Sequence, residues 1–344
     1  MIKRALYIGQ YTEGTTSKRR ADVLKLLLPG WNFRIIDTHI PFFETPFVFR
    51  SLGFRTKSGP LIDKTNRYIL GHATEDHYDL IWTDKAVYIT KETTRVLREK
   101  TDCMIHYTPD PAFTFHRSLH FTNSLRYYDL AVTTKSYELS RYQKYLPEDS
   151  LMFIPQGIRI PPVLTGEKEG EKMKGMVFIG HYEKERGEII RKLLQNEVPV
   201  ALAGIKWGRF VNKMKPYPLL QYLGTGIYGP GYFHTLGAYQ FGWGALSRWV
   251  PEKHTTRTFE IPACGTALVS ERNEEICSFF SEDEAILYSS PGEMIEKLKY
   301  FMGHPRELEE VTRNGFAKIA GGRFSYENQF REVLINAGIL LPTS

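Results

Sequence analysis

The sequence predicts an α/β protein made of two Rossmann-like, doubly wound domains that face each other across a cleft. Three observations lead to this prediction. The length of 344 residues corresponds to two domains at roughly 150 residues each. Short apolar runs alternate with helical patterns, which is typical of parallel sheets covered by helices. The strand–glycine–helix unit that opens the chain is used a second time after residue 175.

The first domain is predicted over residues 1–158. An apolar run ends in Gly9 and leads into a segment with apolar residues at helical spacing. The same alternation of apolar runs and helical patterns continues to the end of the domain. It predicts strands at 5–9, 33–36, 80–82, 103–106 and 130–132, with helices at 18–28, 93–100 and 137–146.

A linker is predicted over residues 159–175, where two prolines precede a polar run of Gly, Glu and Lys. The second domain is predicted over 176–324. Its strands are expected at 176–179, 200–203, 241–243, 268–269 and 286–288. Ser290 to Glu293 form a capping box with Pro291 at the first helical position. The segment 325–344 is expected to form a C-terminal helix that packs back on the first domain.

The composition is that of a soluble globular protein, with 42% apolar and 24% charged residues. No stretch approaches the ~18 apolar residues of a membrane helix, and the N-terminus lacks a secretory signal pattern. We therefore expect a cytoplasmic protein. Three widely spaced cysteines predict neither a disulfide framework nor a zinc site.

The net charge is +6 and the isoelectric point is about 9.0, which favours anionic partners. Because lysines and arginines are scattered along the chain, a nucleotide or phosphorylated ligand fits this charge at least as well as nucleic acid. We do not expect nucleic acid to be the partner.

The segment 252–265 is the most informative for chemistry. Two glutamates, Glu252 and Glu260, bracket Arg257, and Glu260 begins a short helical turn. A guanidinium matches the oxygens of a diphosphate, and a carboxylate at a helix start can accept the hydroxyls of a ribose. This pattern indicates a nucleotide clamp. The alternative is a surface helix with an ion pair.

These residues are similar to those of a known protein family. Segment 257–265, together with 271–273, 279–280 and the helices from 290 to 326, resembles the C-terminal half of the glycosyltransferases related to spore maturation protein CgeB, which are GT-B enzymes. The likeness is closest over residues 175–330. It implies that Glu260 holds the donor's ribose and that Arg257 meets its diphosphate.

The resemblance leaves the role of Glu252 open. Glu252 and Glu260 match the E-x7-E spacing of the large retaining GT-B family, in which the first glutamate lies near the donor sugar. That family has a glycine-rich run after the first glutamate, whereas 253–255 here read Lys-His-Thr. Retention or inversion of configuration therefore stays open as well.

Further donor-binding candidates lie in the second domain. Gly180 and His181 follow its first strand, where backbone N–H groups can face an anion. Lys206, beside Trp207, could offer a cation and an aromatic surface, and the resemblance implies that Tyr228 stacks on the base. The alternatives are a polar histidine at a strand end and a solvated lysine. The glycine-rich turn at 224–232 lacks the G-K-[ST] ending of a phosphate-binding loop, and the loop from Gly9 to Gly14 lacks the G-x-G-x-x-G fingerprint of dehydrogenases.

The acceptor is expected at the first domain. The loop after the first strand offers Tyr11, Thr12 and Glu13 to an acceptor's hydroxyls. Asp110 ends another strand and is the candidate general base if the reaction inverts configuration. The alternative for Asp110 is a turn-forming residue between two prolines. His39 and His106 also end strands and are spare candidates.

Aromatic and cationic residues interleave over 41–57, a pattern that suits a lipid-linked acceptor at an anionic membrane surface. The alternative is a connecting helix packed on the first sheet. We favour the helix, because helical spacing places Phe47 and Phe54 on one face. Peripheral membrane contact stays open.

The sequence thus predicts a glycosyltransferase of the hexosyltransferase type. It would move a sugar from a nucleotide-diphosphate sugar, by family analogy a UDP-sugar, to a hydroxyl of a saccharide, glycan or other acceptor. The donor is a co-substrate, and neither a cofactor nor a metal ion is expected. The alternatives are a nucleotide-sugar 2-epimerase of the same fold, a non-catalytic carbohydrate-binding or spore-coat protein, and a nucleic-acid-binding protein.

Overall fold

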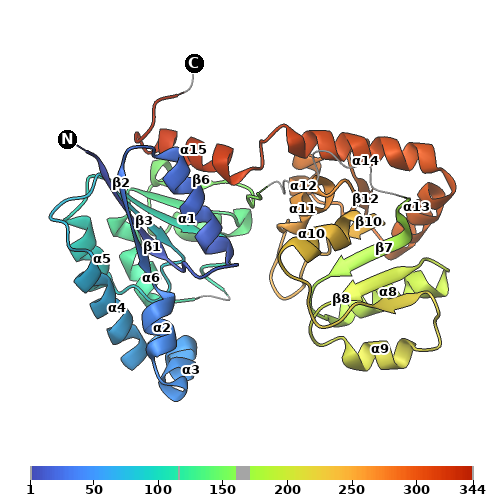
Figure 1. The fold of residues 1–344 in the computed structure, drawn as a ribbon, viewed down its shortest axis with the longest axis horizontal. Coiled ribbons are helices and arrows are strands. Elements are labelled where there is room, and N and C mark those ends of the chain that lie inside the picture. Colours follow the sequence, from blue (N-terminus) through green and yellow to red (C-terminus); the bar gives the residue numbers. More distant parts are fainter. Residues whose placement is uncertain (1, 115–116, 160–170, 343–344) are drawn as a thin grey trace. The chain divides into compact units, whose positions relative to one another are not determined.

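The computed structural model describes residues 2–114, 117–159 and 171–342. The chain forms two compact units, each around its own parallel sheet (Figure 1). The first unit contains residues 1–155 and 326–344, and the second contains residues 156–325. Residues 160–170 of the predicted linker, with Pro161 and Pro162, lie outside the described residues. None of the described helices combines the length and apolar character needed to cross a membrane.

The sheet of the first unit has six strands in the order β2-β1-β3-β4-β5-β6, and all neighbouring strands are parallel. The five predicted strands are confirmed, and the short edge strand β6 was not predicted. The strands are β1 (Arg4–Gly9), β2 (Asn32–Asp37), β3 (Leu80–Asp84), β4 (Met104–Thr108), β5 (Leu130–Thr133) and β6 (Leu151–Phe153).

Helices cover both faces of the first sheet. One apolar cluster joins the sheet to α1 (Thr16–Leu27) and α15 (Tyr326–Asn336), and the other joins it to α4 (Pro60–His72) and α5 (Lys91–Arg98). Two shorter helices, α6 (Leu119–Ser124) and α7 (Leu139–Tyr142), lie nearer β5 and β6. Burial on both faces explains why the strands read as continuous apolar runs instead of alternating ones.

The α15 helix is the last helix of the described chain and belongs to the core of the first unit. Phe330 of α15 is fully buried, and its ring centroid lies 5.0 Å from that of Trp82 and 5.3 Å from that of Tyr107. Val333 and Leu334 are fully buried in the same cluster. The last helix therefore completes the face that α1 begins.

The aromatic segment after β2 differs from the favoured prediction. Instead of one connecting helix on the sheet, it forms α2 (His39–Glu44) and α3 (Phe47–Thr56), because Pro46 separates the two. Gly53 of α3 packs against Leu61 of α4, so α3 lies on a helix and not on the sheet. Phe47 and Phe54 are 73% and 45% exposed, and the expectation that they pack on the sheet was wrong.

The sheet of the second unit has the order β12-β11-β10-β7-β8-β9, again with parallel pairs. The predicted strands are confirmed, and the short edge strand β9 was not predicted. The strands are β7 (Met173–Ile179), β8 (Val200–Ala203), β9 (Leu220–Tyr222), β10 (Tyr239–Trp243), β11 (Ala267–Glu271) and β12 (Ile286–Tyr288).

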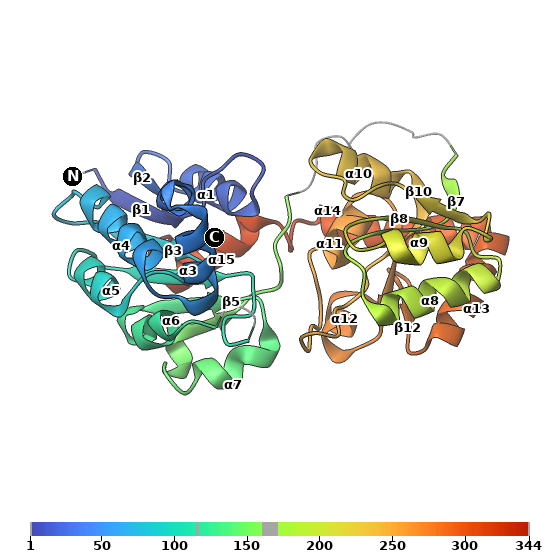
Figure 2. The same ribbon diagram turned by 90° about the horizontal axis from the view of Figure 1, so that it is seen from below.

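Helices cover both faces of the second sheet as well (Figures 1 and 2). One face carries α8 (Lys184–Gln195), α9 (Gly208–Met214) and α13 (Pro291–Gly303), and the other carries α10 (Pro230–Gly237), α11 (Arg257–Ala263) and α12 (Glu274–Phe279). The long helix α14 (Pro305–Ala320) follows α13. The predicted cap is confirmed, since the Ser290 side chain accepts a hydrogen bond from the Glu293 N–H at 3.2 Å.

Each sheet has one point at which the strand order reverses. In the first sheet it lies between β1 and β3, and in the second between β7 and β10. At such a switch point the chain leaves two neighbouring strands toward opposite faces, which opens a crevice at their carboxyl ends where ligands of open α/β sheets bind. The loops at these two points are therefore the candidates for ligand binding.

The packing of α15 gives a first prediction. Phe330→Ala removes a buried aromatic ring and should lower the free energy of unfolding by about 3–5 kcal/mol. Urea denaturation followed by circular dichroism measures it. The control is Leu341→Ala, because Leu341 is 88% exposed in the same C-terminal segment. Equal stability of the two variants would show that α15 is not part of the core.

Candidate functional site

The second switch point is built around the buried carboxylate of Glu183. This side chain accepts hydrogen bonds from Ser247 Oγ and from the Arg248 N–H, both at 3.0 Å. It also forms a 2.9 Å ion pair with Arg186 at the start of α8. Glu183 follows β7, and Ser247 and Arg248 follow β10. One carboxylate therefore joins the loops that leave the two strands of the switch point.

The hydrogen bonds keep this buried group ionised. Burial by itself would raise the pKa of the Glu183 carboxyl. The N–H of Arg248 and the charge of Arg186 outweigh burial, so the pKa lies below its usual value. Glu183 therefore stays a carboxylate at neutral pH and holds the loops as a charge-assisted acceptor.

Two guanidinium groups meet beside this carboxylate. The Cζ atoms of Arg186 and Arg257 lie 5.4 and 5.8 Å from the ring centroid of Phe178 on β7. Burial and the nearby charge of Arg257 lower the pKa of Arg186 to about 10, against the opposing effect of Glu183. Both Nε atoms are buried and lack a hydrogen-bond partner among the described residues. This arrangement places two positive charges near one another and leaves both Nε–H donors without a partner among the described residues.

His181 lies in the same loop as Glu183. Its Nε2 is 3.0 Å from Glu183 Oε1, and its ring centroid is 5.0 Å from that of Trp249. Burial and the charge of Arg186 lower the pKa of His181 below its ordinary value, so the ring is neutral at pH 7. A neutral imidazole here can donate or accept a hydrogen bond without adding to the repulsion between the arginines.

Gly180 allows the loop after β7 to pass close to its neighbours. A Cβ atom at Gly180 would lie 2.7 Å from the ring of Phe178. The Gly180 carbonyl accepts a 2.7 Å hydrogen bond from Trp207 Nε1. Trp207 is fully buried, so its predicted role as a free aromatic surface for the donor was wrong. The aromatic surface beside Lys206 is Trp249, which is 62% exposed.

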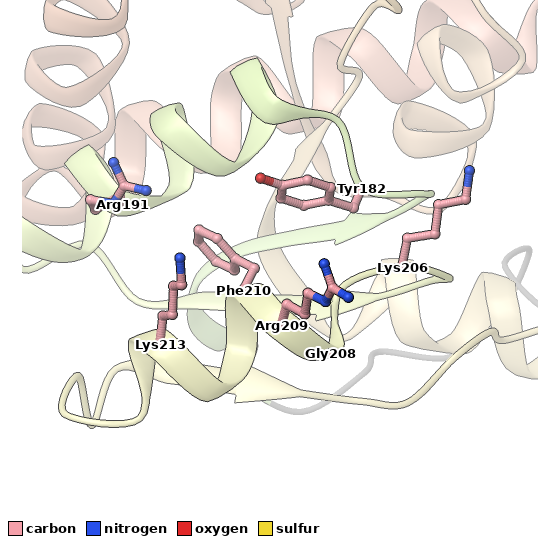
Figure 3. Close-up of a pocket in the computed structure, with 7 residues that line it drawn as sticks. All are labelled: Tyr182, Arg191, Lys206, Gly208, Arg209, Phe210 and Lys213. Carbon is pink, nitrogen blue, oxygen red and sulfur yellow. The ribbon is translucent and has the colours of Figure 1, made fainter.

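Lys206 lines a hollow between α8 and α9 (Figure 3). The hollow has a volume of about 680 Å³ and is lined by four cations, Lys206, Arg191, Arg209 and Lys213, around the rings of Tyr182 and Phe210, with Gly208. No carboxylate pairs with these cations among the residues that the structure describes. Lys206 also lies over Trp249, at 5.6 Å, and so connects the hollow to the His181 loop.

Both glutamates of the predicted clamp accept a hydrogen bond from another part of the second unit. Glu260 in α11 lies one helical turn after Arg257 and accepts a 2.8 Å hydrogen bond from the Tyr232 hydroxyl of α10. Burial and the charge of Glu260 raise the pKa of Tyr232 well above its ordinary value, so Tyr232 remains a donor. Glu252 accepts a 3.0 Å hydrogen bond from the Ser247 N–H, in the loop that Glu183 holds.

Tyr228 lies apart from this cluster. It precedes α10 in a glycine-rich turn and is 82% exposed. A Cβ atom at Gly226 would lie 2.5 Å from the Tyr228 hydroxyl, so the ring folds back over its own turn. Stacking on a base stays a prediction.

At the first switch point the predicted acceptor loop follows β1. The Tyr11 N–H donates to Asp37 Oδ1 at 2.9 Å, and the Thr12 hydroxyl lies 2.6 Å from His39 Nδ1. Glu13 is exposed and reaches Lys18 at 3.6 Å. The loop is thereby fixed against the end of β2 and the start of α2.

Asp110 follows β4 and pairs with Lys85, which follows β3, at 2.7 Å. Behind them lies His106, which is 1% exposed and packs between Phe121 and Tyr128. Lys85, Asp110 and His106 share a small hollow at the carboxyl ends of these strands. The predicted base thus lies in the first unit at the edge where an acceptor is expected.

The structure brings three predicted residues together at one switch point, Gly180, His181 and Arg257, with Glu252 and Glu260 close in the chain. Sequence reasoning missed Glu183, Arg186, Ser247 and Arg248. A signal for two of them exists, because Glu183 and Arg186 stand three residues apart at the start of a helix that follows a strand and a glycine. Nothing in the sequence ties Ser247 to Glu183.

Comparisons with known proteins agree with this architecture. Residues 186–335 match the protein-family model described as Glycosyl transferase-like. A search of curated proteins finds no significant match.

Several solved structures share the fold over nearly the whole chain. HepE of Anabaena in complex with UDP and glucose is 16% identical over 96% of this chain and 99% of that chain, with a TM-score of 0.61. A glycosyltransferase from Rickettsia africae is 12% identical over 99% and 100%, with a TM-score of 0.67. The α,α-trehalose-phosphate synthase (UDP-forming) from Burkholderia vietnamiensis is 12% identical over 99% and 100%, with a TM-score of 0.66. The chain has the GT-B fold.

A pH prediction follows from His106. Burial lowers its pKa to about 3, so the folded state holds the ring neutral while the unfolded chain protonates it near pH 6.5. The stabilisation is therefore fully present above pH 6.5 and is lost as the pH falls toward 3. Between pH 7 and pH 5 the wild type should lose about 2 kcal/mol more stability than His106→Phe, measured by urea denaturation. Parallel pH profiles would contradict it.

Proposed function

We propose that this chain is a glycosyltransferase that moves a sugar from a nucleotide-diphosphate sugar, in particular a UDP-sugar, to an acceptor hydroxyl. Within the GT-B enzymes we propose a relationship to the CgeB-like glycosyltransferases, on the motifs of the second unit. The match of residues 186–335 to glycosyl transferase-like proteins supports the reaction class. HepE in complex with UDP and glucose supports UDP as the nucleotide.

The observation that carries this proposal is the pair of arginines at the second switch point. Arg186 and Arg257 lie over one aromatic ring, and each has a buried Nε without a hydrogen-bond partner among the described residues. Glu183 pairs with Arg186 and only partly offsets the repulsion between the two guanidinium groups, so a further anion at this pair is favoured. A diphosphate supplies two charges and several acceptor oxygens in the geometry that guanidinium groups match.

The same pair suits the chemistry of transfer. As the bond between the sugar and the diphosphate breaks, negative charge grows on the leaving phosphate. Donors that are already in place stabilise this charge more in the transition state than in the ground state. Arg186 is fixed by Glu183, so little reorganisation is needed. Glu260, held by Tyr232, is assigned to the ribose hydroxyls.

In the first unit, Tyr11, Thr12 and Glu13 are assigned to the acceptor. Asp110, which pairs with Lys85 at 2.7 Å, would accept the proton of the attacking hydroxyl in an inverting reaction. Glu252 holds the Ser247 loop in the structure. We assign Glu252 a place beside the donor sugar on the basis of its E-x7-E spacing with Glu260.

The test of the arginine pair uses Arg257→Gln, with Glu260→Gln for the ribose. Arg257→Gln should slow sugar transfer on the order of 10²-fold, because one donor to the developing charge is lost. UDP at 100 times its Kd stabilises a binding protein by about 2.7 kcal/mol, so thermal unfolding should show a UDP-dependent shift that both variants reduce.

Arg313→Gln, an exposed arginine on α14, is the matched control and should behave as the wild type. Turnover and UDP affinity that stay unchanged in Arg257→Gln and Glu260→Gln would remove these two residues from the donor site.

A second experiment addresses metal ions. Among the described residues no group of three His, Cys, Asp or Glu side chains is arranged to hold a metal ion. Because Arg186 and Arg257 can neutralise the diphosphate, we expect transfer to continue in the presence of a chelator. Activity that disappears in chelator and returns with Mn²⁺ would refute metal-independent transfer.

A further inference from the structure

An apolar surface remains on α2 and α3 of the first unit that the proposed chemistry does not use. We call it the α2–α3 face. In Figure 1 α3 lies at the lower end of this unit, and in Figure 2, seen from below, it lies toward the viewer. The face consists of Phe43, Phe47, Val48, Phe49, Leu52 and Phe54. All six side chains are exposed, up to 73% for Phe47 and 71% for Val48.

Packing within the protein does not explain these side chains. Of the ten residues of α3, only Gly53 is buried, and it contacts Leu61 of α4. The apolar residues of α3 point in several directions around the helix, since Phe47, Val48 and Phe49 are consecutive. A helix that is apolar nearly all round and lies on the surface needs another apolar medium to cover it.

The charges around this face are positive. Residues 40–57 contain Arg50, Arg55 and Lys57 and one carboxylate, Glu44, which pairs with Lys64 of α4 at 3.0 Å. The Arg50 guanidinium lies between 5.5 and 5.7 Å from the ring centroids of Phe42, Phe43 and Phe47. Arg50 therefore stands at the level of the aromatic rings, where a lipid phosphate would meet it.

The apolar surface continues onto α6. Leu119 is 68% exposed, and the neighbouring His120 Nε2 lies 2.8 Å from the Lys57 carbonyl at the end of α3. Arg117, before α6, is exposed as well. One exposed apolar side chain and one exposed cation thus lie beside the end of α3.

We propose that the α2–α3 face docks on an anionic lipid bilayer, with the apolar side chains of α3 in the interface and Arg50, Arg55 and Lys57 against lipid phosphates. A short helix exposed on most sides can be surrounded by acyl chains, whereas a flat protein partner would cover only one side. The rim of cations complements an anionic surface. Burying several large apolar side chains in the interface is enough for reversible binding.

The location of this face gives the docking a role, and that role rests on the proposed function. The face begins directly after β2, and His39 of α2 contacts Thr12 of the predicted acceptor loop. The Phe42 ring lies 6.2 Å from Tyr88, three residues after Lys85. Docking would therefore bring a membrane surface next to the loops assigned to the acceptor, which fits an acceptor hydroxyl carried by a lipid.

Vesicle cosedimentation of the full chain tests the docking. The wild type should bind phosphatidylcholine vesicles that contain phosphatidylglycerol and bind pure phosphatidylcholine vesicles more weakly. Phe47→Glu combined with Val48→Glu should reduce binding to the anionic vesicles at least tenfold, since two apolar side chains are lost and two charges of the wrong sign are added.

The matched control is Ile2→Glu combined with Leu26→Glu, which makes the same change of charge at side chains of the same unit that are 72% and 73% exposed. It should retain vesicle binding. An absence of binding by the wild type, or an equal loss in both double variants, would overturn the proposal. Self-association of the wild type that the α3 variant alone abolishes, without vesicle binding, would overturn it in favour of a second copy of the chain.

The UDP-dependent thermal shift separates this proposal from the proposed function. The α3 double variant should keep the full shift, because the arginine pair lies in the second unit. Vesicle binding without any UDP shift in the wild type would refute the glycosyltransferase proposal and leave the docking supported. A UDP shift without vesicle binding would overturn the docking proposal and leave the glycosyltransferase proposal supported.

Discussion

The ionised carboxylate of Glu183 is the interaction on which the second unit's site depends. It holds the loop after β7, the loop after β10 and the first turn of α8 with hydrogen bonds of 2.9–3.0 Å. Taking a carboxylate out of water is costly unless its oxygens are satisfied, and here backbone, hydroxyl and guanidinium donors satisfy them. The position of Arg186, and with it the geometry of the arginine pair, follows from this one buried group.

The distribution of ion pairs in the molecule supports this view of the site. Some cations elsewhere pair with a carboxylate, as Arg20 does with Asp84 in the core of the first unit and Arg272 does with Glu282 in the second. At the second switch point, by contrast, Arg257 shares its surroundings with another arginine. The four cations of the nearby hollow extend the positive region. An excess of positive charge over adjoining loops attracts a multiply charged anion and orients it.

Most of the fold could be predicted from the sequence because both sheets are buried on both faces. Such strands form short apolar runs with a glycine or polar residue at the end, as at Gly9 and Gly180. The edge strands β6 and β9 have three residues each and are only partly buried, so they leave too short a pattern. The α3 helix misled prediction for another reason. Its apolar spacing is that of a core helix, and exposure is not encoded in spacing.

The sequence could offer Arg257 and Glu260 as candidates because they stand three residues apart in one local motif. Contacts between residues from separate segments were not predictable. Ser247 and Glu183 stand 64 residues apart, and only the reversal of strand order between β7 and β10 brings them together. Contacts of this kind depend on sheet topology, which a single sequence indicates only through the order of its elements.

The place of α15 in the core of the first unit has a consequence for biosynthesis. Residues 156–325 are contiguous, so the second unit can be finished soon after its last residue leaves the ribosome. Residues 1–155 of the first unit are translated earlier. Trp82 and Tyr107 can pack against Phe330 only after residue 330 has been synthesised. At about 5–20 residues per second that interval is on the order of ten seconds or more. During it, the apolar side chains of α1 and of the first sheet that α15 covers in the folded chain remain without this cover.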